Sequence, residues 1–299
     1  MKIFVTGAAG YIGGSVAMGL RDDGHQVTGL VRSVEQAQAL AALGIATQLG
    51  SLDDRALLIR EARAADAVIN AASSDHAGAV DALLEGLAGS GKVFIHTSGS
   101  SIVGDASGGE ASEPIYDEEH LPVPTADKAA RVAIDQRVRA AAELGIRSVV
   151  LCNTLIYGEG RGLPRDSVQL PRLIKQARHS GVMRHVGRGL NIWSNVHIDD
   201  VVALYRLALA KAPAGSFYFV ENGSASFLQM TRALAAAMQL GEPQDWPLDA
   251  AIAEWGYEMA SYGLGSNSRV RSDRVRAELG WVPQHASVLE WIASAVRPD

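Results

Sequence analysis

The sequence predicts an α/β protein with a doubly wound parallel sheet and a smaller C-terminal lobe. Short apolar segments alternate with helix-like segments over the first half of the chain, and a glycine-rich turn follows the first apolar segment. The alternation ends near residue 155, where prolines begin to separate shorter elements. Alternating strands and helices form a parallel sheet covered by helices on both faces, so we expect the first half of the chain to form that sheet.

Six short segments are expected to be the strands, because each is apolar and is bounded by glycine or charged residues. In chain order they are KIFVT, QVTGLV, IATQL, DAVINAA, KVFIHTS and RSVVLCN. The segments between them are expected to be helices, and several end in glycine, which commonly terminates a helix. These segments are YIGGSVAMGLRDDG, VEQAQALAALG, DDRALLIREARAA, HAGAVDALLEGLAGSG and DKAARVAIDQRVRAAAELG.

The composition excludes several classes of protein. The 299 residues carry a net charge of −6 and no basic stripe, so we do not expect general nucleic-acid binding. The single cysteine, Cys152, cannot form an internal disulfide and fits a reducing compartment. No uninterrupted apolar run reaches the roughly 18 residues that suggest a membrane helix. We therefore expect a cytoplasmic protein without a membrane span.

The turn TGAAGYIGG at residues 6–14 lies between the first strand and the first helix, which is the context of a dinucleotide-binding turn. Gly7 would permit the tight turn, Gly10 would let the backbone approach a pyrophosphate, and Gly13 would let the helix pack close to the strand. The helix N-terminus would then offer its free N–H groups to the phosphates. The residues expected to bind the cofactor here are Thr6, Gly7, Ala9, Gly10, Tyr11, Ile12 and Gly13.

The end of the second strand indicates NADP as the cofactor. A cofactor without a 2′-phosphate is usually held by a carboxylate about 20 residues beyond the glycines. Here the strand ends in Arg32 and Ser33, with no acid. A guanidinium and a hydroxyl suit a 2′-phosphate, so we expect NADPH to be preferred over NADH.

Several short motifs follow one another along the chain: TGAAGYIGG, GSLDD, NAA, TSGSSIVGD, YG at 157–158, HIDDVV at 197–202 and LGWVP at 279–283. In combination they resemble the extended short-chain dehydrogenase/reductase family, which includes nucleotide-sugar epimerases and dehydratases. The resemblance implies a Rossmann-type cofactor domain over residues 1–155, to which elements around 190–220 also contribute. Residues 156–299 would mainly form a substrate-binding lobe. The resemblance also implies cofactor contacts from Ser51, Leu52, Ala71, Ala72, Thr97, Ser98, Lys128 and Asn153.

The family's catalytic helix carries Tyr-x-x-x-Lys, yet the corresponding segment here, PVPTADKAAR, contains no tyrosine. An acid usually follows the lysine by four positions. If Asp135 is that acid, Arg131 takes the place of the lysine and Asp127 that of the tyrosine. If Lys128 is the lysine, Pro124 takes the place of the tyrosine. Either register implies an atypical member of the family that lacks the catalytic tyrosine.

One helical turn separates Lys128 from Arg131, so only one of the two is expected to face inward. Upstream, the resemblance puts Gly99 where the family's catalytic serine or threonine stands, with serines on both sides. The catalytic candidates are Asp127, Lys128, Arg131, Ser98 and Ser100. The proton could also come from Tyr116, His120, Tyr157, solvent or the substrate.

Three further features have less specific interpretations. The long acidic loop at residues 99–122 is expected to be either a lid or a solvated loop. His197 is expected to pack or to cap the helix that begins beside it, and Cys152 to be a small buried residue. The histidines are scattered without the spacing of metal ligands, so we expect no metal site.

Four functions are compatible with these features. The leading one is an NADP-dependent oxidoreductase that reduces a small carbonyl compound, and the second is an epimerase or dehydratase acting on an activated sugar. A non-catalytic NADP-binding regulator is the third, and a hydrolase is the fourth, although it would lack every nucleophile motif. The expected partner is a small-molecule substrate, and a homodimer is possible by the resemblance.

Overall fold

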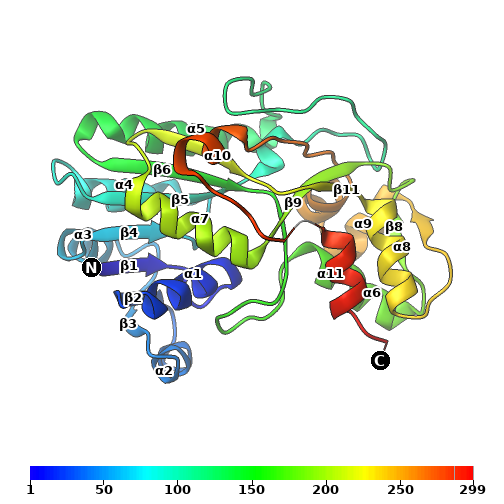
Figure 1. The fold of residues 1–299 in the computed structure, drawn as a ribbon, viewed down its shortest axis with the longest axis horizontal. Helices are drawn as coiled ribbons and strands as arrows, with labels where there is room; N and C mark the ends of the chain where they lie inside the picture. The colour runs from blue at the N-terminus through cyan, green and yellow to red at the C-terminus, as the bar shows by residue number, and fades with distance from the viewer. Residues whose placement is uncertain (286, 299) are drawn as a thin grey trace.

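The computed structural model describes residues 1–285 and 287–298 and has a seven-stranded parallel sheet at its centre (Figure 1). The strand order is β10-β6-β5-β4-β1-β2-β3. The order reverses between β1 and β4, as it does in doubly wound dinucleotide-binding sheets. The predicted Rossmann-type fold class is therefore confirmed. The strands are β1 (Lys2–Thr6), β2 (Gln26–Val31), β3 (Ala46–Leu49), β4 (Ala67–Asn70), β5 (Val93–Gly99), β6 (Arg147–Asn153) and β10 (Ser216–Val220).

Helices connect these strands and cover both faces of the sheet. The six predicted strands and the five helices between them form at the expected places. Two short 3₁₀ segments, η1 (Ser100–Val103) and η2 (Ala141–Leu144), follow β5 and α5. The helices are α1 (Tyr11–Asp22), α2 (Val34–Ala42), α3 (Arg55–Ala64), α4 (Ala77–Leu87), α5 (Ala126–Ala140) and α7 (Ile198–Lys211).

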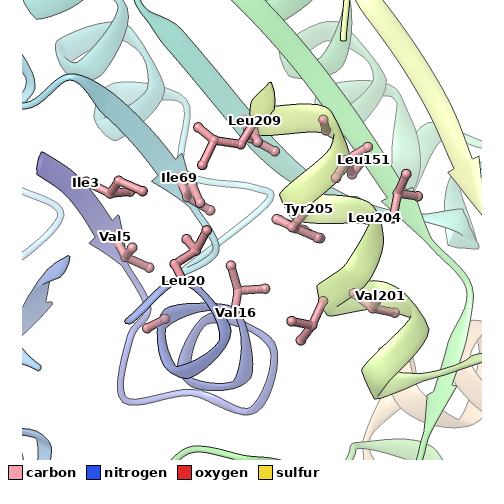
Figure 2. Close-up of a cluster of buried hydrophobic side chains, with 14 of the residues drawn as sticks. Ile3, Val5, Val16, Leu20, Ile69, Leu151, Val201, Leu204, Tyr205 and Leu209 are labelled. Atoms are coloured by element: carbon pink, nitrogen blue, oxygen red, sulfur yellow. The ribbon is translucent and has the colours of Figure 1, made fainter. Parts of the chain in front are cut away.

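The central strands are buried on both faces, so alternate residues of one strand enter two different hydrophobic cores. In β1, Ile3 and Val5 belong to one core and Phe4 belongs to the other. Figure 2 shows the first core, where α1 and α7 pack against the same face of the sheet. The second core lies under α3, α4 and α5. A helix and a strand from the second half of the chain, α7 and β10, therefore complete the central sheet and its helical layers.

The remaining elements form a lobe beyond the carboxyl ends of the central strands (Figure 1). It has a core of its own around Trp193, Phe227 and Met230. Its strands are β7 (Leu155–Tyr157), β8 (Arg184–Val186), β9 (Ile192–His197), β11 (Ser224–Ser226) and β12 (Gln244–Trp246). Its helices are α6 (Gln169–Ser180), α8 (Phe227–Ala237), α9 (Leu248–Trp255), the π-helical segment η3 (Glu258–Leu264) and α11 (Val288–Ala295), while α10 (Asp273–Leu279) packs on α7 and β10. Within the described residues, no helix is both long and apolar enough to cross a membrane.

Candidate active site

The glycine-rich turn between β1 and α1 leaves no room for side chains on its protein side. Gly7 has a φ of +73°, and a Cβ atom there would lie 2.5 Å from the carbonyl oxygen of Ala71. A Cβ atom on Gly13 would collide with the carbonyl oxygen of Gly7. The turn and the helix can therefore approach each other this closely only because both residues are glycines.

Gly10 instead opens onto a cavity of about 460 Å³. Within 4 Å of a Cβ atom built on Gly10 lies only the carbonyl oxygen of Gly7, at 3.1 Å. Helix α1 starts directly after Gly10 and has no side-chain cap, so no side chain occupies its first N–H groups. This arrangement fits a pyrophosphate held by backbone groups at a helix N-terminus. The predicted cofactor residues that line the cavity are Gly7, Ala9, Gly10, Arg32, Ser51, Leu52, Ala71 and Ala72.

Arg32 and Ser33 lie side by side in sequence but have different environments. Arg32 is exposed at the edge of the cavity, and among the described residues its guanidinium has no hydrogen bond and no ion pair. Ser33 caps α2, because its hydroxyl oxygen accepts a hydrogen bond from the backbone N–H of Gln36 at 3.3 Å. The pKa of the Glu35 carboxyl is lowered first by a hydrogen bond from its own backbone N–H and then by one from the Ser33 hydroxyl. Arg32 is therefore the group that is available to a 2′-phosphate.

A second cavity, of about 280 Å³, lies between the central sheet and the lobe. It shares Ala71 with the first cavity and sits at the carboxyl edge of the sheet, where ligands bind in such folds. Its polar groups include Ser98 at the end of β5 and Asn153 at the end of β6. The Oδ1 atom of Asn153 is buried and has no hydrogen-bond partner among the described residues. The lobe contributes Ile156, Ser167, Val168 and Gln169.

Helix α5 turns three charged residues toward the sheet: Lys128, Arg131 and Asp135. Lys128 is only 2% exposed. The Arg131 guanidinium donates to Ser101 Oγ at 2.8 Å and forms a two-pronged ion pair with Asp75, with N–O distances of 2.8 and 2.6 Å. The expectation that only one of Lys128 and Arg131 would face inward is therefore wrong, because residues three apart on a helix lie on the same side. Neither of the two lines the second cavity.

The start of α5 is covered by the π-helical segment η3. Lys128 forms an ion pair with Glu258, and its Nζ atom lies 4.2 Å from the ring centroid of Tyr262. The Tyr262 hydroxyl donates to Asp127 Oδ2 at 2.8 Å. Lys128 and Asp127 are thus bound to η3 and do not point into the cavity. Tyr262 is a phenol that sequence reasoning missed, because it is 135 residues away from Asp127 in the chain and belongs to no motif.

One turn further along α5, Asp135 joins a buried chain of polar side chains. Ser98 Oγ donates to Asp135 Oδ2 at 2.7 Å, and His96 Nε2 lies 3.7 Å from Asp135 Oδ1. Asn70 Nδ2 lies 3.0 Å from His96 Nδ1, and Asn70 Oδ1 accepts from Thr6 Oγ1 at 2.6 Å. Burial raises the pKa of Asp135 to about 7 and lowers the pKa of His96 to about 4. Asn70 and His96 were not among the site residues predicted from the sequence, although polar residues inside apolar strands were an available signal.

Several other predicted site residues make structural contacts and line neither cavity. Thr6 and Gly13 are buried beneath the turn. Thr97 Oγ1 lies 2.7 Å from the Tyr205 hydroxyl, and Ser100 Oγ accepts from Ser268 Oγ at 2.7 Å. The predicted set is therefore divided between residues that line the cavities and residues that hold the strand ends in place.

The alternative proton donors also lie away from the second cavity. The Tyr157 hydroxyl donates to the backbone oxygen of His285 at 3.2 Å, inside the lobe. Tyr116 pairs through its backbone with Val270, and His120 is exposed beside Asp117. None of the three lines this cavity.

Two of the less specific interpretations are confirmed. His197 caps α7, because its Nδ1 atom accepts from the backbone N–H of Asp199 at 3.2 Å, and Cys152 is fully buried. The acidic loop is anchored to the rest of the protein. The Glu118 carboxylate accepts from the Phe219 N–H at 2.9 Å, and Asp105 accepts from Asn267 Nδ2 at 3.0 Å.

A model of the NAD-dependent epimerase/dehydratase family matches residues 3–220. Among curated proteins, the chain is 33% identical to oxidase ucsJ of an Acremonium species, over 94% of this chain and 92% of that protein. It is 32% identical to a 2-alkyl-3-oxoalkanoate reductase of Stenotrophomonas maltophilia, over 75% of this chain and 71% of that one. The chain is also 28% identical to a ketoreductase of Stigmatella aurantiaca that acts on a farnesyl-dihydroquinoline oxide, over 94% of this chain and 92% of that protein.

Solved structures share the fold at lower identity. The UDP-glucose 4-epimerase of Thermotoga maritima superposes with a TM-score of 0.78 at 20% identity, covering 99% of this chain and 97% of that one. The dTDP-glucose 4,6-dehydratase DesIV of Streptomyces venezuelae, solved with NAD bound, has a TM-score of 0.79 at 20% identity, covering 99% and 96%.

Proposed function

The chain belongs to the NAD-dependent epimerase/dehydratase family, and from this premise we propose that it is an NADP-dependent reductase of a small carbonyl compound. The family and the named reductases among its relatives make it an NAD(P)-dependent enzyme of the oxidoreductase type. The choice of NADP and the class of substrate are the parts that we propose.

The choice of NADP rests on Arg32. Its guanidinium is at the edge of the first cavity and has no partner among the described residues, so it can bind a 2′-phosphate without breaking another interaction. The nearest acidic side chain in sequence, Glu35, is bonded to Ser33. A charge-assisted hydrogen bond contributes about 1.5–3 kcal/mol, which corresponds to a preference for NADPH of at least tenfold.

We infer the class of substrate from the size and the lining of the second cavity, which is the main observation in support of the proposed function. At about 280 Å³ it is at the small end of ligand sites, and Ile12, Ala71 and Ile156 make much of its wall apolar. Ser98 and Asn153 provide the few polar groups. Such a cavity suits a compact carbonyl compound beside a nicotinamide ring.

Different residues of the chain would hold the two phosphate groups of the cofactor and shape the substrate site. The turn at Gly7 and Gly10 would hold the pyrophosphate, and Arg32 would hold the 2′-phosphate. When bound, the reduced nicotinamide supplies a hydride. We also propose that residues 1–155 bind the cofactor while residues 156–299 mainly shape the substrate site, because both parts line the second cavity.

The test is a panel of small aldehydes, ketones and 3-oxo acids with NADPH, followed by the loss of NADPH absorbance and by product analysis. We expect substrate-dependent oxidation of NADPH by the wild-type protein and none by Gly10→Val. If NADPH binds but no compound in the panel is reduced, the proposed reductase function is wrong.

A second candidate, an epimerase or dehydratase acting on an activated sugar, is supported by a different observation. A larger cavity of about 800 Å³ adjoins the second one through Ser167 and Val168. Its lining includes Arg165, Arg172, Lys175, Arg178 and Arg297, which suit a diphosphate. This candidate predicts isotope exchange at a carbon of a nucleotide sugar without net oxidation of the cofactor, whereas the reductase predicts stoichiometric oxidation.

A further inference from the structure

We propose that Asp135 is the acid that supplies the proton for carbonyl reduction, and that the Ser98 hydroxyl passes this proton to the substrate oxygen. The inference rests on the proposed reductase function. In this proposal, the proton that the family's tyrosine would donate comes instead from the buried pair of Ser98 on β5 and Asp135 on α5.

Ser98 differs from the other hydroxyls that line the second cavity. The Tyr11 hydroxyl donates to the backbone oxygen of Gly158 at 2.8 Å, and the Thr154 hydroxyl donates to that of Val220 at 2.7 Å, so their hydrogens are occupied. Ser167, the fourth, has no carboxyl group within hydrogen-bond reach among the described residues. Among the hydroxyl groups that line this cavity in the described part of the chain, only that of Ser98 makes a direct hydrogen bond to a carboxyl group.

The position of the proton on Asp135 follows from the side chains behind it. Thr6 donates to Asn70 Oδ1, so the Asn70 amide nitrogen must donate to His96 Nδ1. The hydrogen of neutral His96 is then on Nε2 and faces Asp135 Oδ1 at 3.7 Å. When Asp135 is ionised, Ser98 Oγ donates to Oδ2. When the carboxyl is neutral, Oδ1 faces an N–H group, so the proton is on Oδ2 and the direction of this hydrogen bond is reversed: Oδ2–H donates to Ser98 Oγ, whose own hydrogen is then free for the substrate.

The surroundings keep this carboxyl protonated near neutral pH and can still accommodate its charge after the proton has left. Burial is the main cause of its raised pKa, while the hydrogen bond from Ser98 and the charges of Arg131 and Arg139 oppose the rise. After proton loss, the His96 N–H is in place to approach Oδ1, which has no hydrogen-bond partner among the described residues. The titratable and charged groups that face Asp135 are His96 from β5, Cys152 from β6, Arg131 and Arg139 from α5, and Asp75 from the loop after β4.

The hydride would come from the reduced nicotinamide, whose C–H bond breaks as the ring is oxidised. It bonds to the carbonyl carbon, and the C=O π electrons move to the oxygen, which takes the hydrogen of Ser98 Oγ. Ser98 Oγ takes the hydrogen of Asp135 Oδ2, which leaves a carboxylate on Asp135 and an intact serine. After the alcohol product has left, water that enters the cavity returns a proton through the same two hydrogen bonds in the opposite direction.

The first test needs no turnover. Protein labelled with ¹³C at the aspartate carboxyl groups is titrated by NMR, and the Asp135 signal is identified as the one that is missing in Asp135→Asn. We expect its midpoint near pH 7, and a higher midpoint in Ser98→Ala, which removes a hydrogen bond to the carboxylate. A midpoint near 4 would leave no proton to donate at neutral pH and would overturn the proposal.

The second test is kinetic and uses a carbonyl compound that the wild-type protein reduces. Loss of a general acid costs about 10²- to 10⁴-fold in rate. We expect Ser98→Ala and Asp135→Asn to lower kcat by that factor with an unchanged KM for NADPH, and Ser98→Thr to retain most of the activity. The wild-type kcat/KM should fall above about pH 7, and this dependence should disappear in Asp135→Asn.

The control is Asp81→Asn, which replaces by an amide a half-exposed carboxyl on α4 that forms an ion pair with Arg137 at 2.6 Å. It should leave both kcat and the pH profile unchanged. If the folded Ser98→Ala or Asp135→Asn protein reduced the substrate at the wild-type rate, the proposed proton relay would be wrong, but the proposed reductase function would not be affected. A wild-type protein that reduces no carbonyl compound would overturn the reductase function itself, and the relay would fall with it.

Discussion

Replacing Asp135 by asparagine should make the free energy of unfolding rise, relative to that of the wild type, as the pH increases from about 4 to 8. The folded-state pKa of Asp135 is about 7, above its ordinary value of 3.8. Its contribution to the free energy of unfolding is therefore complete below about pH 4 and is lost as the pH rises through 7. About three pKa units at 1.36 kcal/mol each correspond to a loss of roughly 4 kcal/mol over this range.

The titration of His96 changes the free energy of unfolding in the opposite direction to that of Asp135 between about pH 4 and 6.5. Its folded-state pKa of about 4 lies below its ordinary value of 6.5. Its contribution is present above pH 6.5 and is lost as the pH falls through 4, a change of roughly 3 kcal/mol. The two effects nearly cancel in the wild-type protein, whose stability should therefore change little between pH 4 and 6.5 on account of these two groups.

The difference between Asp135→Asn and the wild type is dominated by the aspartate, because the pKa of the neighbouring His96 is lowered by its burial and by the charge of Arg131 and not by Asp135. Urea unfolding of both proteins at a series of pH values from 4 to 8 should show the variant gaining roughly 4 kcal/mol relative to the wild type. Asp81→Asn, which replaces a half-exposed carboxyl, should show no such trend. A difference between Asp135→Asn and the wild type that does not vary with pH would refute the assignment of a buried, protonated carboxyl.

Three further predictions concern the cofactor and the helix start. Arg32→Ala should remove most of the preference for NADPH over NADH, a loss of at least tenfold by calorimetry, and equal affinities in the wild type would contradict the NADP assignment. The Gly10→Val protein should fold normally by circular dichroism but fail to bind the cofactor, because the new side chain would project into the first cavity. The control variant Gly241→Val, at an exposed glycine, should bind the cofactor normally. Tyr262→Phe should lower the free energy of unfolding by about 0.5–1.5 kcal/mol through the lost hydrogen bond, with kcat nearly unchanged. A hundredfold fall in kcat would identify Tyr262 as the proton donor.

The sequence by itself determined the cofactor domain and the place of its first cavity. Strand and helix patterns and the glycine spacing of Gly7, Gly10 and Gly13 depend on residues that are close in the chain, so short-range rules suffice to interpret them. The presence of Arg32 in place of an acid at the end of β2 was evident from the same local pattern. The absence of a tyrosine from the segment that became α5 was likewise evident from the residues alone.

Only the tertiary structure decided which groups surround α5. The contact between Ser98 and Asp135 joins residues 37 positions apart, and the contact between Asp127 and Tyr262 spans 135 positions. No local pattern encodes such distances, because they depend on how β5, α5 and η3 pack in the folded chain. The same packing buries Asp135, and this burial raises its pKa to about 7, since a carboxylate loses its hydration when it leaves water.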